Sequence, residues 1–448
     1  MRHRWPAARR FVLPIAVVLA ACDPVEDVRR LFDGATPRES YVHRLESAGL
    51  ASSAAVRDWI AAGEAALTNA PLVDLPYEES GYLAPTEPLA VAVRFDVVRG
   101  ERISVALTLH SDTAALTFLD LFRAGSDTAA VLEPVSSADS AERSLEFEPR
   151  RPGEYAVRMQ PELLRGGRYT LRISRAAALA FPVSGRGRSA VQSVFGDPRD
   201  AGAREHHGID IFAPRGTPVV AVADAHVRRV NETNRGGRVV WLRDERRGLS
   251  LYYAHLDSQL VTAGMDVRAG DTVGLVGNSG NARTTPPHLH FGIYSRGEGP
   301  LDPLPFVHRP ERSPPSLAVD TSAFGAWLRG TSEGARLRAA PDPDADVMAE
   351  LPVHTAARVV AGTGSWYRVR LPDGRSGYLA ASVADVAAAP VEELTPGDAT
   401  PLLERPVASA AVMDSVMPAE RVDVYARFGD YLLVSTNGSR KGWMRESP

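Results

Sequence analysis

The sequence predicts a mainly β, multidomain protein built largely from antiparallel sheets. Three observations lead to this prediction. The chain has 448 residues, which is too long for one ordinary hydrophobic core and indicates two to four domains. Apolar and polar residues alternate over several short segments, as they do in half-buried strands. A weak internal repeat near the C-terminus predicts two further small β domains.

The first 21 residues have the features of a signal peptide. Basic residues lie between positions 2 and 10, and the apolar run at 11–21 is too short for a stable membrane span. The run ends in Leu19-Ala20-Ala21-Cys22, which resembles a bacterial lipobox. We therefore expect a lipoprotein signal peptide at 1–21 and a lipid anchor on Cys22. The alternative is a buried N-terminal helix with an incidental cysteine.

Composition excludes several kinds of site. Cys22 is the only cysteine, so the chain can form no internal disulfide and no cysteine-rich zinc site. A metal ion must be held by His, Asp or Glu. The formal net charge of -4 argues against a nucleic-acid partner.

Two accessory regions precede the predicted catalytic domain. Val56, Trp59 and Ile60 recur near helical spacing, so we expect a helical stalk or a small helical hairpin at 22–72, with Ser52 or Ser53 as a helix cap. Alternating segments then predict a β-sandwich at 73–176. Its expected strands lie at 91–95, 103–107, 116–122, 145–147, 153–158 and 169–173.

The C-terminal part contains the repeat. An aromatic strand at 364–369 is followed by a Gly-aromatic pair at 377–378, and the same order recurs at 429–434 and 442–443. These units resemble bacterial SH3-like barrels, which often bind cell-wall peptides. We expect a linker at 309–323, rich in Pro and Ser, and two SH3-like barrels at 324–388 and 397–447.

Three short motifs in the middle of the chain contain five residues of the types that bind metal ions. His206 and Asp210 flank a bend that contains a glycine, and His288 and His290 lie two apart on a predicted strand. Residues i and i+2 of a strand project to the same face, so this strand offers both imidazoles on one side. His255 lies between the two motifs. Two neutral imidazoles and one carboxylate suit zinc and leave a fourth position for water.

These residues resemble peptidase family M23, the lysostaphin-type zinc endopeptidases of the cell wall. The resemblance runs from about Val191 to Pro305. Its motifs are Ser193-Val194-Phe195-Gly196, Gly208-Ile209-Asp210-Ile211, residues 213–219, Tyr253-Ala254-His255-Leu256, residues 267–274, Gly277-Asn278-Ser279-Gly280 and Pro287-His288-Leu289-His290-Phe291.

The resemblance implies an antiparallel β-sheet catalytic domain at 185–308 with one zinc ion. It implies that His206, Asp210 and His290 bind the metal and that His288 is the general base. His255 matches the histidine that stabilises the oxyanion or shares proton transfer, and the division of work between the two stays open. His207 is an alternative ligand, but the family's spacing selects its neighbour.

We therefore expect a zinc endopeptidase that hydrolyses peptide cross-links of peptidoglycan. One alternative is a non-catalytic wall-binding regulator of other hydrolases, and another is an enzyme that cuts Gly-rich proteins outside the wall. The expected location is the cell envelope, facing the periplasm, with either membrane carrying the anchor. We expect a monomer.

Overall fold

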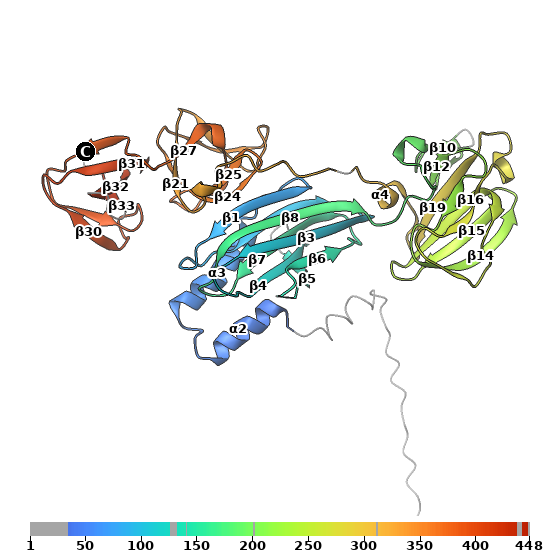
Figure 1. Ribbon diagram of the computed structural model, residues 1–448, viewed down its shortest axis with the longest axis horizontal. Coiled ribbons are helices and arrows are strands. Elements are labelled where there is room, and N and C mark those ends of the chain that lie inside the picture. The colour runs from blue at the N-terminus through green and yellow to red at the C-terminus, as the bar shows by residue number, and fades with distance from the viewer. Residues whose placement is uncertain are drawn as a thin grey trace, which may run out of the picture.

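The computed structural model describes residues 35–125, 132–139, 141–199, 202–310, 312–436 and 441–446. Among these residues, antiparallel strands account for far more of the chain than helices do, so the prediction of a mainly β, multidomain chain is confirmed. Figure 1 shows the β-sandwich in the middle, with the domain expected at 185–308 on one side and the C-terminal units on the other. The expected signal peptide and Cys22 lie outside the described residues. Among the described helices, none is both long and apolar enough to cross a bilayer.

The sandwich consists of two sheets that enclose one core. Its strands are β1 (Tyr77–Leu83), β2 (Val91–Val97), β3 (Glu101–His110), β4 (Thr117–Ala124), β5 (Leu132–Ser137), β6 (Ser144–Phe147), β7 (Gly153–Pro161) and β8 (Gly167–Ala177). One sheet has the order β1-β8-β3-β6 and the other β2-β7-β4-β5. Along β3, every second residue from Glu101 to Leu109 is buried. Period-two alternation therefore gives each strand one face toward the shared core.

The two N-terminal helices pack on the sandwich. They are α2 (Pro37–Ser47) and α3 (Ala54–Thr68), and Ser53 caps α3 by accepting a hydrogen bond from the Val56 amide. The buried Trp59 indole donates to the Pro161 carbonyl at 2.9 Å, and its ring contacts Phe118. The helix expected around Trp59 therefore packs on the sandwich and does not project as a stalk, because the apolar face of α3 is wide enough to be buried against β2 and β7.

The domain expected at 185–308 contains a ten-stranded sheet with one buried face among its described residues. Its strands are β9 (Val191–Ser193), β12 (Ile209–Phe212), β13 (Pro218–Val220), β14 (Ala225–Thr233), β15 (Gly237–Asp244), β16 (Leu249–Gln259), β17 (Asp266–Val267), β18 (Thr272–Val276), β19 (His288–Ser295) and β20 (Gly299–Leu301). The main order is β17-β14-β15-β16-β19-β12-β9. A short hairpin, β10 (Pro198–Arg199) and β11 (Arg204–Glu205), lies apart from this sheet, and α4 (Leu304–Val307) follows it.

The C-terminal units repeat one strand order. The first contains β21 (Trp327–Gly330), β22 (Ala335–Arg338), β23 (Val347–Leu351), β24 (Ala356–Thr363), β25 (Trp366–Arg370), β26 (Ser376–Ala380) and β27 (Ala384–Val386). The second contains β28 (Glu392–Leu394), β29 (Thr400–Leu403), β30 (Val412–Val416), β31 (Val422–Phe428), β32 (Tyr431–Thr436) and β33 (Gly442–Arg445). The orders β23-β22-β26-β25-β24-β21 and β30-β29-β33-β32-β31-β28 correspond strand by strand.

The sandwich and the first C-terminal unit share a sheet. β1 pairs with β8 on one side and with β24 on the other. The buried Arg368 guanidinium lies 3.2 Å from the buried Glu79 carboxylate across this joint. Tyr77 and Tyr169 donate hydroxyl hydrogen bonds to Glu79 at 2.7 and 2.9 Å. Burial raises the pKa of both tyrosines, so they keep the protons that they donate.

We expect Arg368→Met to destabilise this joint strongly, because it leaves the Glu79 carboxylate buried without its cation. The expected loss in the free energy of unfolding is about 3–5 kcal/mol. Urea unfolding followed by fluorescence measures it. Arg172→Met is the matched control: Arg172 pairs with Glu78 on the same strand as Glu79, but its side chain is 59% exposed. The control should lose less than about 1 kcal/mol. Equal losses would contradict the assignment.

Candidate metal centre and active site

Strand register places the candidate ligands. In the β12–β19 pair, Asp210 lies directly opposite His290, and Phe212 lies opposite His288. Their neighbour Leu289 is fully buried in the core. Because successive residues point to opposite faces, Asp210, His288 and His290 share the open face of the sheet.

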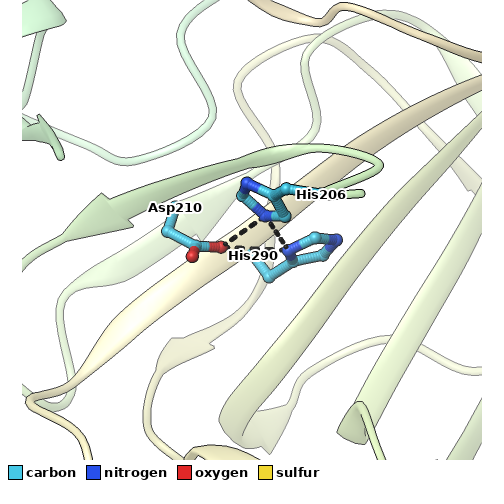
Figure 2. A group of neighbouring side chains, drawn as sticks. All are labelled: His206, Asp210 and His290. Atoms are coloured by element: carbon cyan, nitrogen blue, oxygen red, sulfur yellow. Dashed lines mark hydrogen bonds and ion pairs between the residues drawn. The ribbon is translucent and has the colours of Figure 1, made fainter. Parts of the chain in front are cut away.

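Three donor atoms converge on this face (Figure 2). His206 Nε2 lies 2.9 Å from His290 Nδ1 and 3.1 Å from Asp210 Oδ1, and His290 Nδ1 lies 3.0 Å from the same oxygen. Donors bound at about 2.0–2.1 Å to one tetrahedral Zn²⁺ lie about 3.3 Å apart. Burial alone raises the pKa of Asp210, but the adjacent imidazoles of His206 and His290 outweigh it and hold that pKa far below its usual value. The residues therefore fit a zinc ion in donor type, spacing and charge.

Gly208 is required by the close approach of its loop to the metal-binding strand. A Cβ atom at this position would lie 2.5 Å from the Phe291 carbonyl oxygen and 2.8 Å from the His290 ring. The glycine therefore lets the segment between His206 and Asp210 pass over β19, so that both side chains reach His290.

Backbone carbonyls orient three of the histidines in the same way. The Nδ1 atoms of His206, His255 and His288 lie 2.8, 2.9 and 2.9 Å from the carbonyl oxygens of Val194, Ser279 and Pro286. A carbonyl oxygen only accepts, so each Nδ1 carries the proton and each neutral ring keeps its lone pair on Nε2. This tautomer makes His206 Nε2 a metal donor and leaves the other two Nε2 atoms free to accept protons.

His255 and His288 lie beside the three donors. Their ring centroids are 5.0 Å apart, and His255 lies 6.0 Å from His290. His255 has a φ of 62°, in the left-handed region, and its amide donates to the Gly236 carbonyl at 2.8 Å. Burial, together with the neighbouring His288 imidazole, lowers the pKa of His255 to about 4. His255 is therefore neutral at pH 7.

The structure separates the adjacent histidines of the first motif. His206 is 2% exposed and belongs to the donor group, whereas His207 is exposed and its ring stacks near Phe195, 6.3 Å away. His226 pairs with Asp266 on the surface, outside the site.

Arg199 is a site residue that the sequence analysis missed. It lies on β10, and its Nη2 atom donates to Asp210 Oδ2 and to Ser193 Oγ, both at 2.6 Å. Ser193 donates in turn to Asp197 at 2.7 Å. Arg199 thus holds the carboxylate oxygen that faces away from the donor group. The only signal in the sequence was that Arg199 lies near the motif at 193–196, and spacing alone does not show that a hairpin turns it toward Asp210.

Comparisons with known proteins agree with this geometry. Residues 204–303 match the model of peptidase family M23, and residues 333–384 match that of the bacterial SH3 domain. The chain is 35% identical over 144 residues to the L-Ala--D-Glu endopeptidase of Bacillus subtilis (strain 168), covering 30% of this chain and 44% of that protein. It is 37% identical over 139 residues to the DD-carboxypeptidase/endopeptidase Mpg of Neisseria meningitidis serogroup B, covering 31% and 30%.

A solved structure is also similar over the catalytic region. The catalytic domain of the antimicrobial peptidase lysostaphin from Staphylococcus simulans is 30% identical, with 25% of this chain and 88% of that chain covered and a TM-score of 0.24. The alignments span less than half the length of the two curated relatives above. The catalytic sheet is a domain of peptidase family M23, and a bacterial SH3 domain follows it in the chain.

We expect Arg199→Gln to weaken zinc binding by roughly 10- to 100-fold, because residues that hold a metal ligand contribute on this scale. Competition against a chromophoric chelator measures the affinity without relying on activity. Arg186→Gln, an exposed arginine in the same domain, is the control and should bind as the unaltered chain does. Unchanged affinity in Arg199→Gln would show that the ion pair plays no part in metal binding.

The metal-free domain should lose stability as the pH falls from 6.5 toward 4. An unfolded histidine has a pKa of about 6.5, whereas folded His255 has a pKa of about 4. In this interval the unfolded chain binds a proton that the folded chain does not, so the free energy of unfolding decreases. His255 should account for about 2 kcal/mol of the loss between pH 7 and pH 5.

Urea unfolding at both pH values, with chelator present, measures this loss. His255→Gln should show a smaller pH dependence, and the remainder includes His290, whose pKa burial also lowers. An equal pH dependence in the two proteins would refute the role of His255.

Proposed function

We propose that the chain is a zinc-dependent endopeptidase that hydrolyses peptide cross-links of bacterial peptidoglycan. One observation carries the proposal: three metal donors and two further histidines, His255 and His288, surround one point on an open sheet face. A purely structural metal site has no use for two extra imidazoles with free Nε2 atoms. The chemistry that does use them is metal-assisted hydrolysis.

His206, Asp210 and His290 are the proposed ligands. Two neutral imidazoles and one carboxylate leave a bound divalent ion with a net charge of +1 and an open coordination position. A Zn²⁺ ion held by these residues would act as a Lewis acid toward the scissile carbonyl and would make the attacking water easier to deprotonate. Arg199 keeps Asp210 in place and takes up part of its negative charge.

His288 and His255 are the proposed proton-transfer residues. His288 accepts a proton at Nε2 from the attacking water, since its Nδ1 proton is committed to the Pro286 carbonyl. The Phe212 ring stacks on His288 at 4.9 Å and keeps it in this orientation. Neutral His255 likewise has only a lone pair at Nε2. Its first role in proton transfer is therefore to accept a proton. It donates to an oxyanion or a leaving amine only after it has taken up a second proton.

The proposed substrate and location follow from the relatives and the flanking domains. Two curated relatives are named for endopeptidase activity. The chain also contains a bacterial SH3 domain, which would bind cell-wall peptides. We propose that the chain is exported and remains in the cell envelope as a lipoprotein anchored at Cys22, facing the periplasm. The basic and apolar segments before Cys22 support this proposal.

Digestion of purified sacculi tests the function. The protein should release muropeptides with new amino termini, detectable by mass spectrometry. Chelator should stop the release, and added Zn²⁺ should restore it. His288→Ala should keep the metal but reduce kcat by about 10²–10⁴-fold, and His290→Ala should lose both.

His207→Ala is the matched control, because this exposed histidine adjoins a proposed ligand without contacting the donor group, and it should remain active. Equal release with chelator, or after His290→Ala, would overturn the zinc-enzyme proposal and favour a wall-binding regulator.

A further inference from the structure

The open face of the catalytic sheet continues beyond the metal site as rows of paired residues. Asp210, His290 and Ala254 form one row across β12, β19 and β16. The next row, two residues along β19, joins Gly292 with Tyr252 and then Trp241 with Arg229. A third row joins Tyr294 with Ser250 and Arg243. All these residues share the face that holds the metal donors, because they stand an even number of positions from one another along each strand.

Three half-buried aromatic side chains, here called the aromatic row, lie next to the metal site. They are Trp241, Tyr252 and Tyr294. The Trp241 ring lies 4.4 Å from Tyr252 and 5.4 Å from Tyr294, and Tyr252 lies 5.8 Å from His290. Partly exposed, mutually packed rings of this kind form a rigid surface on which a peptide can lie.

Four arginines line a hollow of about 690 Å³ at the far end of the aromatic row, and we call this hollow the arginine pocket. Its arginines are Arg228, Arg229, Arg243 and Arg296, and Trp241 and Tyr294 form its wall toward the metal site. A bulge in β14 between Val227 and Arg229 leaves both Arg228 and Arg229 exposed at the pocket.

The charges of the arginine pocket are poorly compensated. Arg243 pairs with Glu245 at 3.2 Å, and Glu245 is the only carboxylate that lines the pocket. Within the described parts of the chain, Arg228, Arg229 and Arg296 have no ion-pair partner. Several unpaired guanidinium groups that face one hollow make a site for carboxylates.

We propose that the aromatic row and the arginine pocket form a substrate subsite that binds a free carboxylate of an acidic peptide. This inference rests on the proposed function and specifies its substrate class. Arg229 lies in the row next to that of His290, but on β14, three strand spacings from β19 or about 14 Å across the sheet. An extended peptide covers that distance in about four residues. The subsite therefore selects peptides with a carboxylate about four residues from the cleaved bond, which uncharged glycine bridges lack.

Matched peptides test the subsite. One substrate is a cross-linked stem peptide with free carboxylates, and the other is the same peptide with those carboxylates amidated. The unaltered chain should cleave the acidic peptide with a kcat/KM roughly tenfold higher. The double variant Arg228→Gln/Arg229→Gln should lose that preference through KM, at nearly unchanged kcat. Its cleavage of the amidated peptide should stay the same.

The control carries the same change of charge elsewhere. Arg186→Gln/Arg268→Gln removes two exposed arginines that do not line the pocket and should keep the preference. Equilibrium dialysis of metal-free protein with the two peptides measures binding independently of cleavage, and polyphosphate serves as a competing polyanion.

The outcomes separate the two proposals. Cleavage without preference, or a preference that survives in Arg228→Gln/Arg229→Gln, overturns the subsite and leaves the endopeptidase standing. Binding of the acidic peptide that depends on these arginines, without any cleavage, supports the subsite and overturns the endopeptidase. Arginine-dependent binding of polyphosphate but not of the peptide assigns the pocket to a phosphate polymer and refutes the inference. A failure of both binding and cleavage refutes both proposals.

Discussion

The register between β12 and β19 is the constraint on which the site depends. It sets Asp210 opposite His290 and Phe212 opposite His288, so one pairing places two proposed metal ligands, the proposed general base and the ring that stacks on that base. A slip of β19 by one residue would turn His288 and His290 into the core and bring Leu289 out to solvent. Full burial of Leu289 opposes that slip, so the hydrophobic core enforces the geometry of a polar site.

Local spacing explains how much of the site could be predicted from the sequence. The i, i+2 pair His288 and His290 and the bend at Gly208 place side chains through backbone geometry alone, and the structure brings these residues together. Contacts between residues far apart in the sequence could not be predicted from local spacing. Arg199 reaches Asp210 from a separate hairpin, and the Trp241–Tyr252 contact depends on how β15 and β16 pair.

In the accessory regions, too, local sequence patterns predicted secondary structure, whereas long-range packing could not be predicted. Alternation along β3 predicted its strand and its buried face correctly. It could not predict that β1 would also pair with β24, because an edge strand is open to any partner with free backbone groups. The helix around Trp59 was expected in a stalk or a small hairpin, but its indole is satisfied by the Pro161 carbonyl, 102 residues away in the chain.

The two joints of the sandwich differ in physical character. Toward the SH3 domain, backbone pairing and the buried Glu79–Arg368 pair are shielded from salt. Toward the catalytic sheet, Glu148 pairs with both Arg246 and Arg247, and the Arg246 side chain is 67% exposed. Salt weakens exposed pairs of this kind far more than buried ones. We therefore expect ionic strength to affect the joint with the catalytic sheet more than the joint with the SH3 domain.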